Sequence, residues 1–396
     1  MRVPLLDLSE QYRSLAEPIR QRIDKVLASQ RFILGPNVEA FEKAICRFTG
    51  ATHAIGVSSG TDALLAILMA LEIGPGDAVI TTPYSFFGTA GCIARLGATP
   101  IFVDVDLATY NISASELQRY IEKRCHTGSS GTLIDSEGRK IKAIIPVHLF
   151  GLCCEMNAIH TISERYHLDV IEDAAQAIGA EYRATHMGVR KAGTMGEVGC
   201  FSFYPSKNLG AAGDAGMIVC RDDDLAKRIR VLRQHGMEPR YHHQFIGGNF
   251  RLDEIQAAIL DVKLPYLTSW SAARRAAADF YRDEFTRAGL TDRVTLPVEP
   301  YRKDGLANHH IYHQFVIRTS QRDALREHLT KKEIGTEIYY PVGLHLQKCF
   351  GYLGYKEGDF PDTERATRET LALPIYPEIS REAQRYVVGA TAEFFR

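Results

Sequence analysis

Short apolar runs alternate with longer amphipathic stretches between about Thr52 and Arg221. The apolar runs, rich in Val, Ile and Phe, predict strands at His53–Ser58, Ala78–Thr82, Pro100–Val105, Lys142–Val147, Leu168–Ile171, Gly199–Phe203 and Gly216–Cys220. Helices are predicted between the earlier strands, at Thr61–Leu71, Thr89–Leu96, Ser113–Lys123 and Met156–Tyr166. This alternation indicates an α/β fold with a mostly parallel, mixed sheet that is flanked by helices on both faces.

The pattern changes after Asn249. Two long helical stretches, Leu252–Leu267 and Ser271–Ala288, precede the apolar run Ile311–Arg318, a helical stretch at Arg322–Lys332 and the run Gly335–Tyr340. This mixture predicts a smaller C-terminal α+β domain. We therefore expect a large domain over residues 1–248, with a helical segment at its N-terminus, and a small domain over residues 249–396.

Composition narrows the class of protein. A chain of 396 residues can bury a large core, and its formal net charge of -1 gives no reason to expect nucleic acid or a membrane as partner. No apolar stretch is long enough to span a bilayer, and the first residues acquire charges too early for a secretory signal. The eight cysteines are scattered apart from Cys153 and Cys154, which are adjacent. This usage predicts a reduced, cytoplasmic protein.

Lys207 is the residue that the pattern singles out for chemistry. It follows the predicted strand Gly199–Phe203 and precedes a glycine-rich loop, and Asp173 ends another apolar run upstream. A lysine can form a Schiff base with pyridoxal 5′-phosphate, and an aspartate can keep the pyridine nitrogen protonated so that the ring withdraws electrons. Alone, each residue would be read as a solvated loop residue. Their order along the chain, with the motifs that follow, predicts a pyridoxal-phosphate site.

Three further features suit that cofactor. The segment Ser58–Asp62 lies where a strand is predicted to end and a helix to begin, and such a start can bind a phosphate or simply be capped by Ser and Asp. Gln176 can hydrogen-bond the phenolic oxygen of the cofactor ring or cap the next turn. Either Phe86 or Phe87 can cover the face of the ring, and we favour Phe86.

Two other patterns carry no site. The glycine-rich segment Gly210–Gly216 lacks GxGxxG spacing and precedes a strand, so it does not predict a dinucleotide site. Several histidines gather late in the chain, at His242, His243, His309, His310 and His313. No HExxH or paired Cys/His spacing accompanies them, so no metal is predicted.

Five motifs in this order resemble one known family. They are Phe32–Pro36, Ser59–Leu64, Glu172–Gln176, Ser202–Lys207 and Gly248–Leu252, and the match extends over essentially the whole chain. The sequence resembles the DegT/DnrJ/EryC1/StrS family of pyridoxal-phosphate-dependent nucleotide-sugar aminotransferases. The resemblance implies the fold of aspartate aminotransferase, which is fold type I, and a homodimer with shared active sites.

The resemblance also implies a role for individual residues. Lys207 would be the catalytic residue that carries the cofactor, Asp173 would pair with the pyridine nitrogen, and Gln176 would lie against the ring. The implied phosphate contacts are Ser59, Gly60, Thr61 and Ser202, with Asn249 reaching the phosphate of the partner subunit's cofactor. The implied sugar contacts are Arg251, Tyr339, Tyr340 and His345.

The implied reaction is a ping-pong transamination in amino-sugar biosynthesis. L-glutamate would donate the amino group to a UDP- or dTDP-linked 3- or 4-keto hexose, with the 3-keto sugar favoured, and Lys207 would move the proton between Cα and C4′. A sugar dehydratase of the same family carries histidine at the lysine position, so Lys207 argues against that activity. Two other classes of protein also suit these motifs: a pyridoxal-phosphate-binding regulatory protein without turnover, and a nucleotide-binding module.

Two features depart from the family pattern. His313 stands where relatives often have asparagine, which concerns the expected sugar pocket and not the cofactor site. The stretch His126–Arg139 looks like an insertion before a strand, and it is polar and rich in glycine. We expect it to be a surface loop and not a lid over the substrate.

Overall fold

The computed structural model describes residues 1–129 and 131–396. The main sheet has the spatial order β1 (His53–Val57), β11 (Gly216–Cys220), β10 (Val198–Ser202), β7 (Asp169–Asp173), β6 (Lys140–Ile144), β2 (Asp77–Thr81) and β3 (Thr99–Phe102). Strand β11 is antiparallel to both of its neighbours, and the other pairs in this order are parallel. The predicted mostly parallel, mixed sheet is confirmed, and the carboxyl ends of all these strands except β11 meet at one edge.

Successive side chains of the strands enter two separate cores, because helices cover both faces of the sheet. Val170 of β7 and Phe201 of β10 pack with Phe41 in one core, whereas Ile171 of β7 packs with Leu64 in the other. The helices packed around the sheet are α2 (Pro36–Thr49), α3 (Gly60–Ala70), α4 (Phe87–Arg95), α5 (Ala114–Arg124), α6 (Met156–Tyr166) and α7 (Asp223–Leu232). The side chains of Ser113 and Asp222 cap α5 and α7, which explains where these two helices begin.

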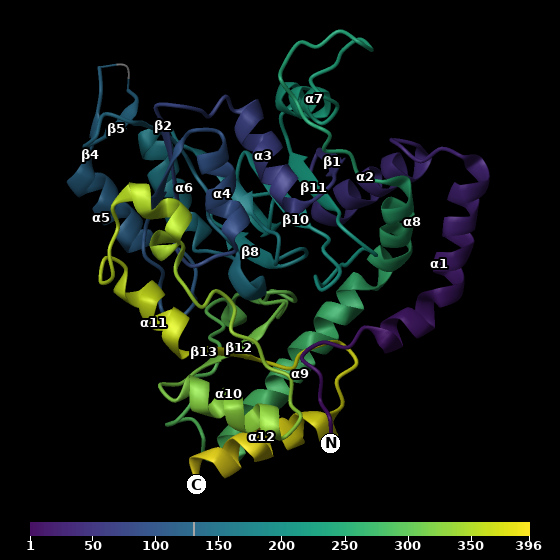
Figure 1. Ribbon diagram of the computed structural model, residues 1–396, viewed down its shortest axis with the longest axis vertical. Helices are drawn as coiled ribbons and strands as arrows, with labels where there is room; N and C mark the ends of the chain where they lie inside the picture. The colour runs from purple at the N-terminus through teal and green to yellow at the C-terminus, as the bar shows by residue number, and fades with distance from the viewer. Residues whose placement is uncertain (130) are drawn as a thin grey trace.

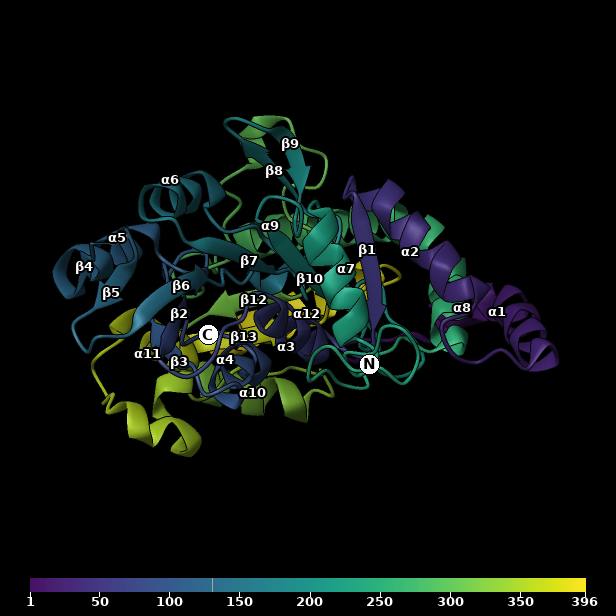
Figure 2. The ribbon, with the colours of Figure 1, turned by 90° about the horizontal axis from the view of Figure 1, so that it is seen from above.

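Long helices lie beyond the β1 edge of the sheet. Figure 2 shows α1 (Ser9–Ser29), α2 and α8 (Glu254–Lys263) together on that side, where α8 packs against both of the others. Helix α8 continues through the 3-10 turn η2 (Leu264–Tyr266) into α9 (Leu267–Arg287), which runs towards the C-terminal part in Figure 1. The two helices predicted after Leu252 are therefore present. Their junction lies at Pro265, because a proline interrupts helical hydrogen bonding.

The C-terminal part has its own small sheet and its own core. Its elements are η3 (Arg302–Asp304), β12 (Phe315–Arg318), α10 (Arg322–Lys331), η4 (Leu344–Leu346), η5 (Lys348–Leu353), α11 (Pro361–Glu369), β13 (Thr370–Leu373) and α12 (Arg381–Phe395). Strands β12 and β13 are antiparallel, and α9 packs against α12. The run Gly335–Tyr340 meets β13 through one bridge, between Glu337 and Ala372. Both chain termini lie at this end of the molecule (Figure 1). The domain boundary near Gly248 stays a prediction.

The stretch His126–Arg139 differs from the predicted loop. Its described residues include parts of two short antiparallel strands, β4 (Cys125–Thr127) and β5 (Leu133–Asp135), while Ser130 lies outside the described residues. The buried Asp135 carboxylate accepts hydrogen bonds from the backbone of Glu137 and Arg139 and from Arg139 Nε at 2.6 Å. These bonds close the turn after β5, so the segment is ordered by a side chain that looked merely polar in the sequence.

A second hairpin was not predicted at all. It consists of β8 (Glu181–Ala184) and β9 (Gly188–Lys191), which pair antiparallel.

In the part of the chain that the structure describes, no helix is both long and apolar enough to cross a bilayer. Nor do three or more His, Cys, Asp or Glu side chains among those residues form a group that could hold a metal ion.

Candidate active site

The turn between β1 and α3 forms the candidate phosphate cup, Ser58–Asp62. Ser59 Oγ accepts a hydrogen bond from Asp62 N at 3.0 Å, and Ser58 Oγ donates to Asp62 Oδ2 at 2.6 Å. Ser59 therefore caps α3, which is the simpler of the two roles that the sequence allows here. The amides of Gly60 and Thr61, in the first turn, have no partner within the helix, so they can still bind an anion. Capping and phosphate binding are compatible in this turn.

The cup lies in close contact with the ends of β10 and β11. A Cβ added to Gly60 would lie 2.9 Å from Ser202 Cβ, and one added to Gly216 would overlap the Ser59 carbonyl group. Neither position leaves room for a side chain, so glycine is required for this approach. The packing brings Ser202 beside the start of α3, as the implied phosphate site requires.

Asp173 ends β7 and is almost completely buried. Thr89 Oγ1 donates to its Oδ2 at 2.8 Å, and Ala175 N donates to its Oδ1 at 3.2 Å. These hydrogen bonds therefore fix the orientation of the carboxylate. Thr89, on α4, was not predicted from the sequence, since it is separated from Asp173 by 84 residues and carries no motif.

Glu172, the residue before Asp173, anchors this strand end. Its fully buried carboxylate accepts hydrogen bonds from Gly193 N (2.8 Å), Met195 N (2.6 Å) and Gly196 N (2.6 Å), and from His148 Nε2 (2.7 Å). His148 Nδ1 accepts from Cys154 N, so Nε2 carries the proton that faces Glu172. Burial alone would raise the pKa of Glu172, but the donated hydrogen bonds outweigh it and lower that pKa. The charged carboxylate thereby ties a loop to the strand that carries Asp173.

Lys207 lies in the turn after β10, where its amide donates to Tyr204 O at 2.8 Å. Burial lowers the pKa of the Lys207 amine to about 8, against the opposing effect of the negative charge of Asp173. Asp173 and Lys207 therefore act on each other electrostatically at the carboxyl ends of neighbouring strands. An amine with this pKa is partly neutral near pH 7, as a nucleophilic or proton-transferring lysine must be.

Gln176 and Tyr340 meet on the side of the C-terminal part. Gln176 Oε1 accepts from Phe150 N at 2.8 Å, and Gln176 Nε2 donates to Tyr340 Oη at 2.8 Å. Tyr340 has a φ of 59°, a left-handed conformation uncommon for an aromatic residue, which marks a backbone held by its surroundings. Tyr339 Oη accepts from Gln314 Nε2 at 2.9 Å.

The two candidate stacking rings have different surroundings. The ring of Phe87 packs against Phe350 with a centroid separation of 5.6 Å, and it also lies against Gly91. Phe86 precedes α4 and is 61% exposed, so much of its ring is free to meet a ligand. These positions favour Phe86 over Phe87.

The remaining predicted residues lie further apart. Asn249 is exposed and follows α7 in the chain, where its backbone forms an isolated antiparallel β-bridge with Gln234. Arg251 pairs with Val57 at the end of β1, next to the cup, and its buried Nε has no hydrogen-bond partner among the described residues. His345 is buried in η4, with its Nε2 3.3 Å from Glu364 Oε1 and its ring against Phe360, so its contacts are with α11 and its neighbourhood.

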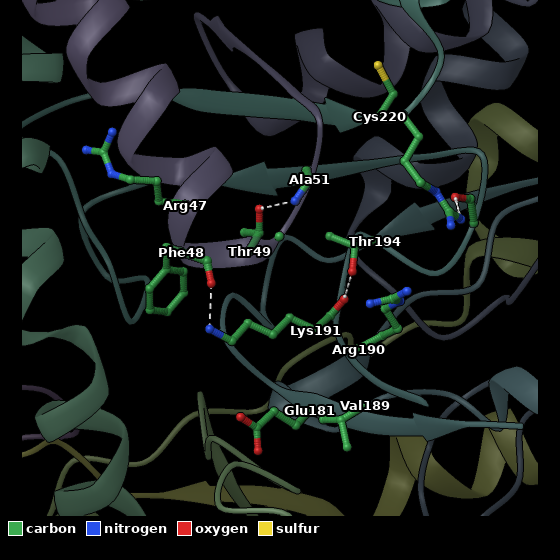
Figure 3. Close-up of a pocket in the computed structure, with 14 residues that line it drawn as sticks. Arg47, Phe48, Thr49, Ala51, Glu181, Val189, Arg190, Lys191, Thr194 and Cys220 are labelled. Atoms are coloured by element: carbon green, nitrogen blue, oxygen red, sulfur yellow. Dashed lines mark hydrogen bonds between the residues drawn. The ribbon is translucent and has the colours of Figure 1, made fainter. Parts of the chain in front are cut away.

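A separate cavity of about 340 Å³ lies at the opposite edge of the sheet, near the amino ends of β1 and β10 (Figure 3). It is lined by Arg47–Ala51, Glu181, Val189–Lys191, Gly193, Thr194, Gly196, Cys220 and Arg221. In Figure 3 the Lys191 amine points to the Phe48 carbonyl oxygen, to which it donates at 2.5 Å. No predicted site residue lines this cavity, so its shape does not bear on the candidate active site.

The residues at the carboxyl edge fit pyridoxal phosphate. The cup presents first-turn amides behind a glycine that allows close approach, Asp173 presents a fixed carboxylate, and Lys207 presents an amine of lowered pKa. These are the groups that the phosphate, the pyridine nitrogen and the aldehyde carbon of that cofactor require.

Comparisons with known proteins agree with this chemistry. The model of the DegT/DnrJ/EryC1/StrS aminotransferase family matches residues 13–392. A protein of Geobacillus stearothermophilus named pleiotropic regulatory protein is 46% identical over 100% of this chain and 99% of its own length. A UDP-N-acetyl-3-dehydro-alpha-D-glucosamine 3-aminotransferase of Acidithiobacillus ferrooxidans is 40% identical, over 96% of this chain and 94% of that protein. A dTDP-3-amino-3,4,6-trideoxy-alpha-D-glucose transaminase of Streptomyces venezuelae is 37% identical, over 99% and 96% respectively.

Solved structures give the same result. A DegT DnrJ EryC1 StrS aminotransferase from Brucella abortus superimposes with a TM-score of 0.89 at 37% identity, over 99% of both chains. NtdA of Bacillus subtilis, solved with bound cofactor PMP, superimposes with a TM-score of 0.84 at 30% identity, over 99% of this chain and 85% of that one. The chain therefore belongs to the DegT/DnrJ/EryC1/StrS aminotransferase family, has its fold type I architecture and is a pyridoxal-phosphate-dependent sugar aminotransferase.

Proposed function

We propose that this enzyme transfers the amino group of L-glutamate to the C3 carbonyl of a UDP- or dTDP-linked keto hexose. The observation that carries this proposal is the placement of Lys207 beside Asp173 at the carboxyl ends of β10 and β7, with the cup against Ser202. The relatives from Acidithiobacillus ferrooxidans and Streptomyces venezuelae are named for amino groups at C3 of a UDP-sugar and a dTDP-sugar. Both names support the choice of C3, and they leave both nucleotides as substrates to test.

Each residue at the carboxyl edge has a proposed task. Lys207 would hold the cofactor until the amino donor displaces it, and the released amine would then take the proton from Cα of the donor and deliver it to C4′ of the cofactor; a pKa of about 8 suits it to both steps. Asp173, fixed by Thr89, holds the proton on the pyridine nitrogen. When bound, the cofactor supplies an electron-withdrawing ring that stabilises negative charge on the carbon that loses its proton. The proposed phosphate contacts are Ser59, Gly60, Thr61 and Ser202.

The remaining residues orient the cofactor and the sugar. Phe86 stacks on the ring, and Gln176 lies against it while holding Tyr340. We assign the sugar contacts to Arg251, Tyr339, Tyr340 and His345. Of these, Arg251 has the strongest support, because its bridge to Val57 places it beside the cup.

We also propose a cytoplasmic homodimer in which Asn249 completes the partner's cofactor site. The exposed position of Asn249 supports this assignment, as does the neighbouring exposed apolar group of Tyr241, Phe245 and Ile246, the last of which is 93% exposed. All eight cysteines are free, as expected in a reducing compartment.

Subunit mixing tests the shared site. A dimer of one Lys207→Ala subunit and one Asn249→Ala subunit contains one complete site if Asn249 acts across the interface. We expect activity to return when the two inactive variants are unfolded together and refolded. Activity that stays at the level of the separate variants would contradict the shared site, provided that sedimentation shows mixed dimers.

The function itself is tested by purifying the protein with its cofactor and offering 3- and 4-keto sugar nucleotides with L-glutamate. We expect glutamate-dependent formation of the 3-amino sugar, and Lys207→Arg to retain part of its cofactor but to lose turnover. Borohydride reduction followed by peptide mass analysis should place a pyridoxyl group on Lys207. Full activity of Lys207→Arg would contradict the assignment.

A regulatory role without turnover is the second candidate, because the relative from Geobacillus stearothermophilus is named a regulatory protein. Glutamate alone distinguishes the two. An aminotransferase converts its bound cofactor to the amine form, and the visible absorbance shifts without any sugar present. A regulatory protein that binds the cofactor without turnover leaves that absorbance unchanged.

A further inference from the structure

A chain of buried hydrogen bonds starts at Asn208, the residue that follows Lys207. Asn208 Nδ2 donates to the carbonyl oxygen of Ile311 at 3.1 Å, which fixes the orientation of the amide. Its Oδ1 then lies 3.0 Å from Nδ1 of His313. Both side chains are more than nine-tenths buried. The contact therefore links the lysine loop to the segment before β12.

The orientation of Asn208 determines the tautomer of His313. An amide oxygen only accepts hydrogen bonds, so His313 Nδ1 must carry a proton, and in the neutral ring Nε2 carries the lone pair. Nε2 lies 3.5 Å from Gln314 Nε2, a donor that also donates to Tyr339 Oη at 2.9 Å. Protonation of His313 would place a second donor against Gln314. The hydrogen-bond pattern thus suits a neutral ring.

The surrounding charges also favour a neutral His313 ring. Burial lowers the pKa of His313 well below its usual value, and the positive charges of Lys207 and Arg274 lower it further. Arg274 lies on α9, where it donates to the carbonyl oxygens of Tyr312 at 3.1 Å and His313 at 3.4 Å. The backbone of His313 is therefore held in place independently of its ring.

We propose that His313 is a positioning residue for Lys207. Its neutral ring holds Asn208, and through Asn208 the turn that presents Lys207, without adding a positive charge beside the amine. The same chain ends at Tyr339, so it connects the lysine turn with a residue on the proposed sugar side. This inference rests on the proposed role of Lys207 in holding the cofactor.

Three substitutions separate a specific hydrogen bond from mere packing. Asparagine offers an N–H donor near the position of Nδ1, glutamine offers one near the position of Nε2, and leucine offers none. We therefore compare His313→Asn, His313→Gln and His313→Leu. His310→Asn is the matched control, because His310 is equally buried in the same segment, but its Nδ1 accepts from Tyr312 N, and among the described residues it forms no hydrogen bond with Asn208.

The readouts are the dissociation constant of pyridoxal phosphate with cofactor-free protein and the visible circular dichroism of the bound cofactor. The dichroism reports how the ring is held, which a purely structural role would not change. His313→Leu and His313→Gln should bind about 3- to 10-fold more weakly, as the loss of one buried hydrogen bond gives, with a reduced dichroic signal. His313→Asn and His310→Asn should stay near the parent protein.

The cofactor affinity and dichroism of the His313 variants decide whether His313 positions Lys207. Equal cofactor affinity and dichroism in the leucine, glutamine and asparagine variants would overturn the role of His313. If the leucine variant does not fold, the asparagine and glutamine pair still decides, since only asparagine should preserve the signal. Borohydride labelling of the parent protein keeps the two proposals distinct, because a label absent from Lys207 overturns the proposed function itself.

Discussion

The buried carboxylate of Glu172 allows a quantitative prediction. Replacement of Glu172 by glutamine keeps the shape but exchanges one acceptor oxygen for an N–H2 group. The remaining oxygen can serve Met195 N and Gly196 N, as Oε1 does now, which leaves Gly193 N and His148 Nε2 facing a donor. Each buried donor without an acceptor costs about 1–3 kcal/mol, so we expect Glu172→Gln to lower the free energy of unfolding by about 2–6 kcal/mol.

Urea unfolding followed by fluorescence measures this loss, with Glu164→Gln as control because Glu164 is an exposed carboxylate on α6. The difference in unfolding free energy between the parent protein and Glu172→Gln should also depend on pH. The pKa of Glu172 is lowered in the folded state, so its stabilisation is fully present above the ordinary value of 4.5 and is lost as the pH falls through the folded pKa. A loss below about 1 kcal/mol at neutral pH would refute the anchoring role, since even one unpaired donor costs that much.

Three further predictions concern the cofactor site. The rate at which cofactor-free protein binds pyridoxal phosphate should rise about tenfold per pH unit below pH 8 and level off above it, because only the neutral Lys207 amine reacts. Stopped-flow absorbance measures this rate, and a flat pH profile would exclude a pKa of about 8 for Lys207. Thr89→Val removes one hydrogen bond from Asp173 and should weaken cofactor binding by about 3- to 10-fold, as measured by equilibrium dialysis. An unchanged affinity would show that Thr89 does not hold the carboxylate. Phe86→Leu should weaken the same binding more than Phe87→Leu does, by about 0.5–1.5 kcal/mol, and the reverse order would identify Phe87 as the stacking ring.

Most strands of the main sheet were predictable because burial on both faces gives a short run rich in Val, Ile and Phe. β11, for example, is buried at every position and was predicted with its observed bounds. The hairpin β8–β9 was not predicted, because three of the four residues of β9 are exposed and no hydrophobic period marks it. β13 is apolar and buried, but it is only four residues long and pairs with a strand 55 residues away, so nothing local identifies it.

The candidate site shows the same division. Lys207 and Asp173 were predictable because each lies in a motif at the end of an apolar run. Thr89 and His148 were not, since their contacts arise only when the parallel order of the sheet brings distant segments together. The His126–Arg139 stretch was misjudged for a related reason, because the buried Asp135 is indistinguishable in sequence from a solvated turn residue.

The crowded contacts of Gly60 with Ser202 and of Gly216 with Ser59 have a consequence for enzyme redesign. They hold the cup against two strands of the sheet, so the proposed phosphate site is rigid. Tyr339 and Tyr340 come from a different part of the chain, and their hydroxyl groups accept hydrogen bonds from Gln314 and Gln176. A library directed at new sugars should therefore keep the cup positions constant and vary Tyr339 and Tyr340, while Gln176 and Gln314, which link these tyrosines to the proposed cofactor site, are retained.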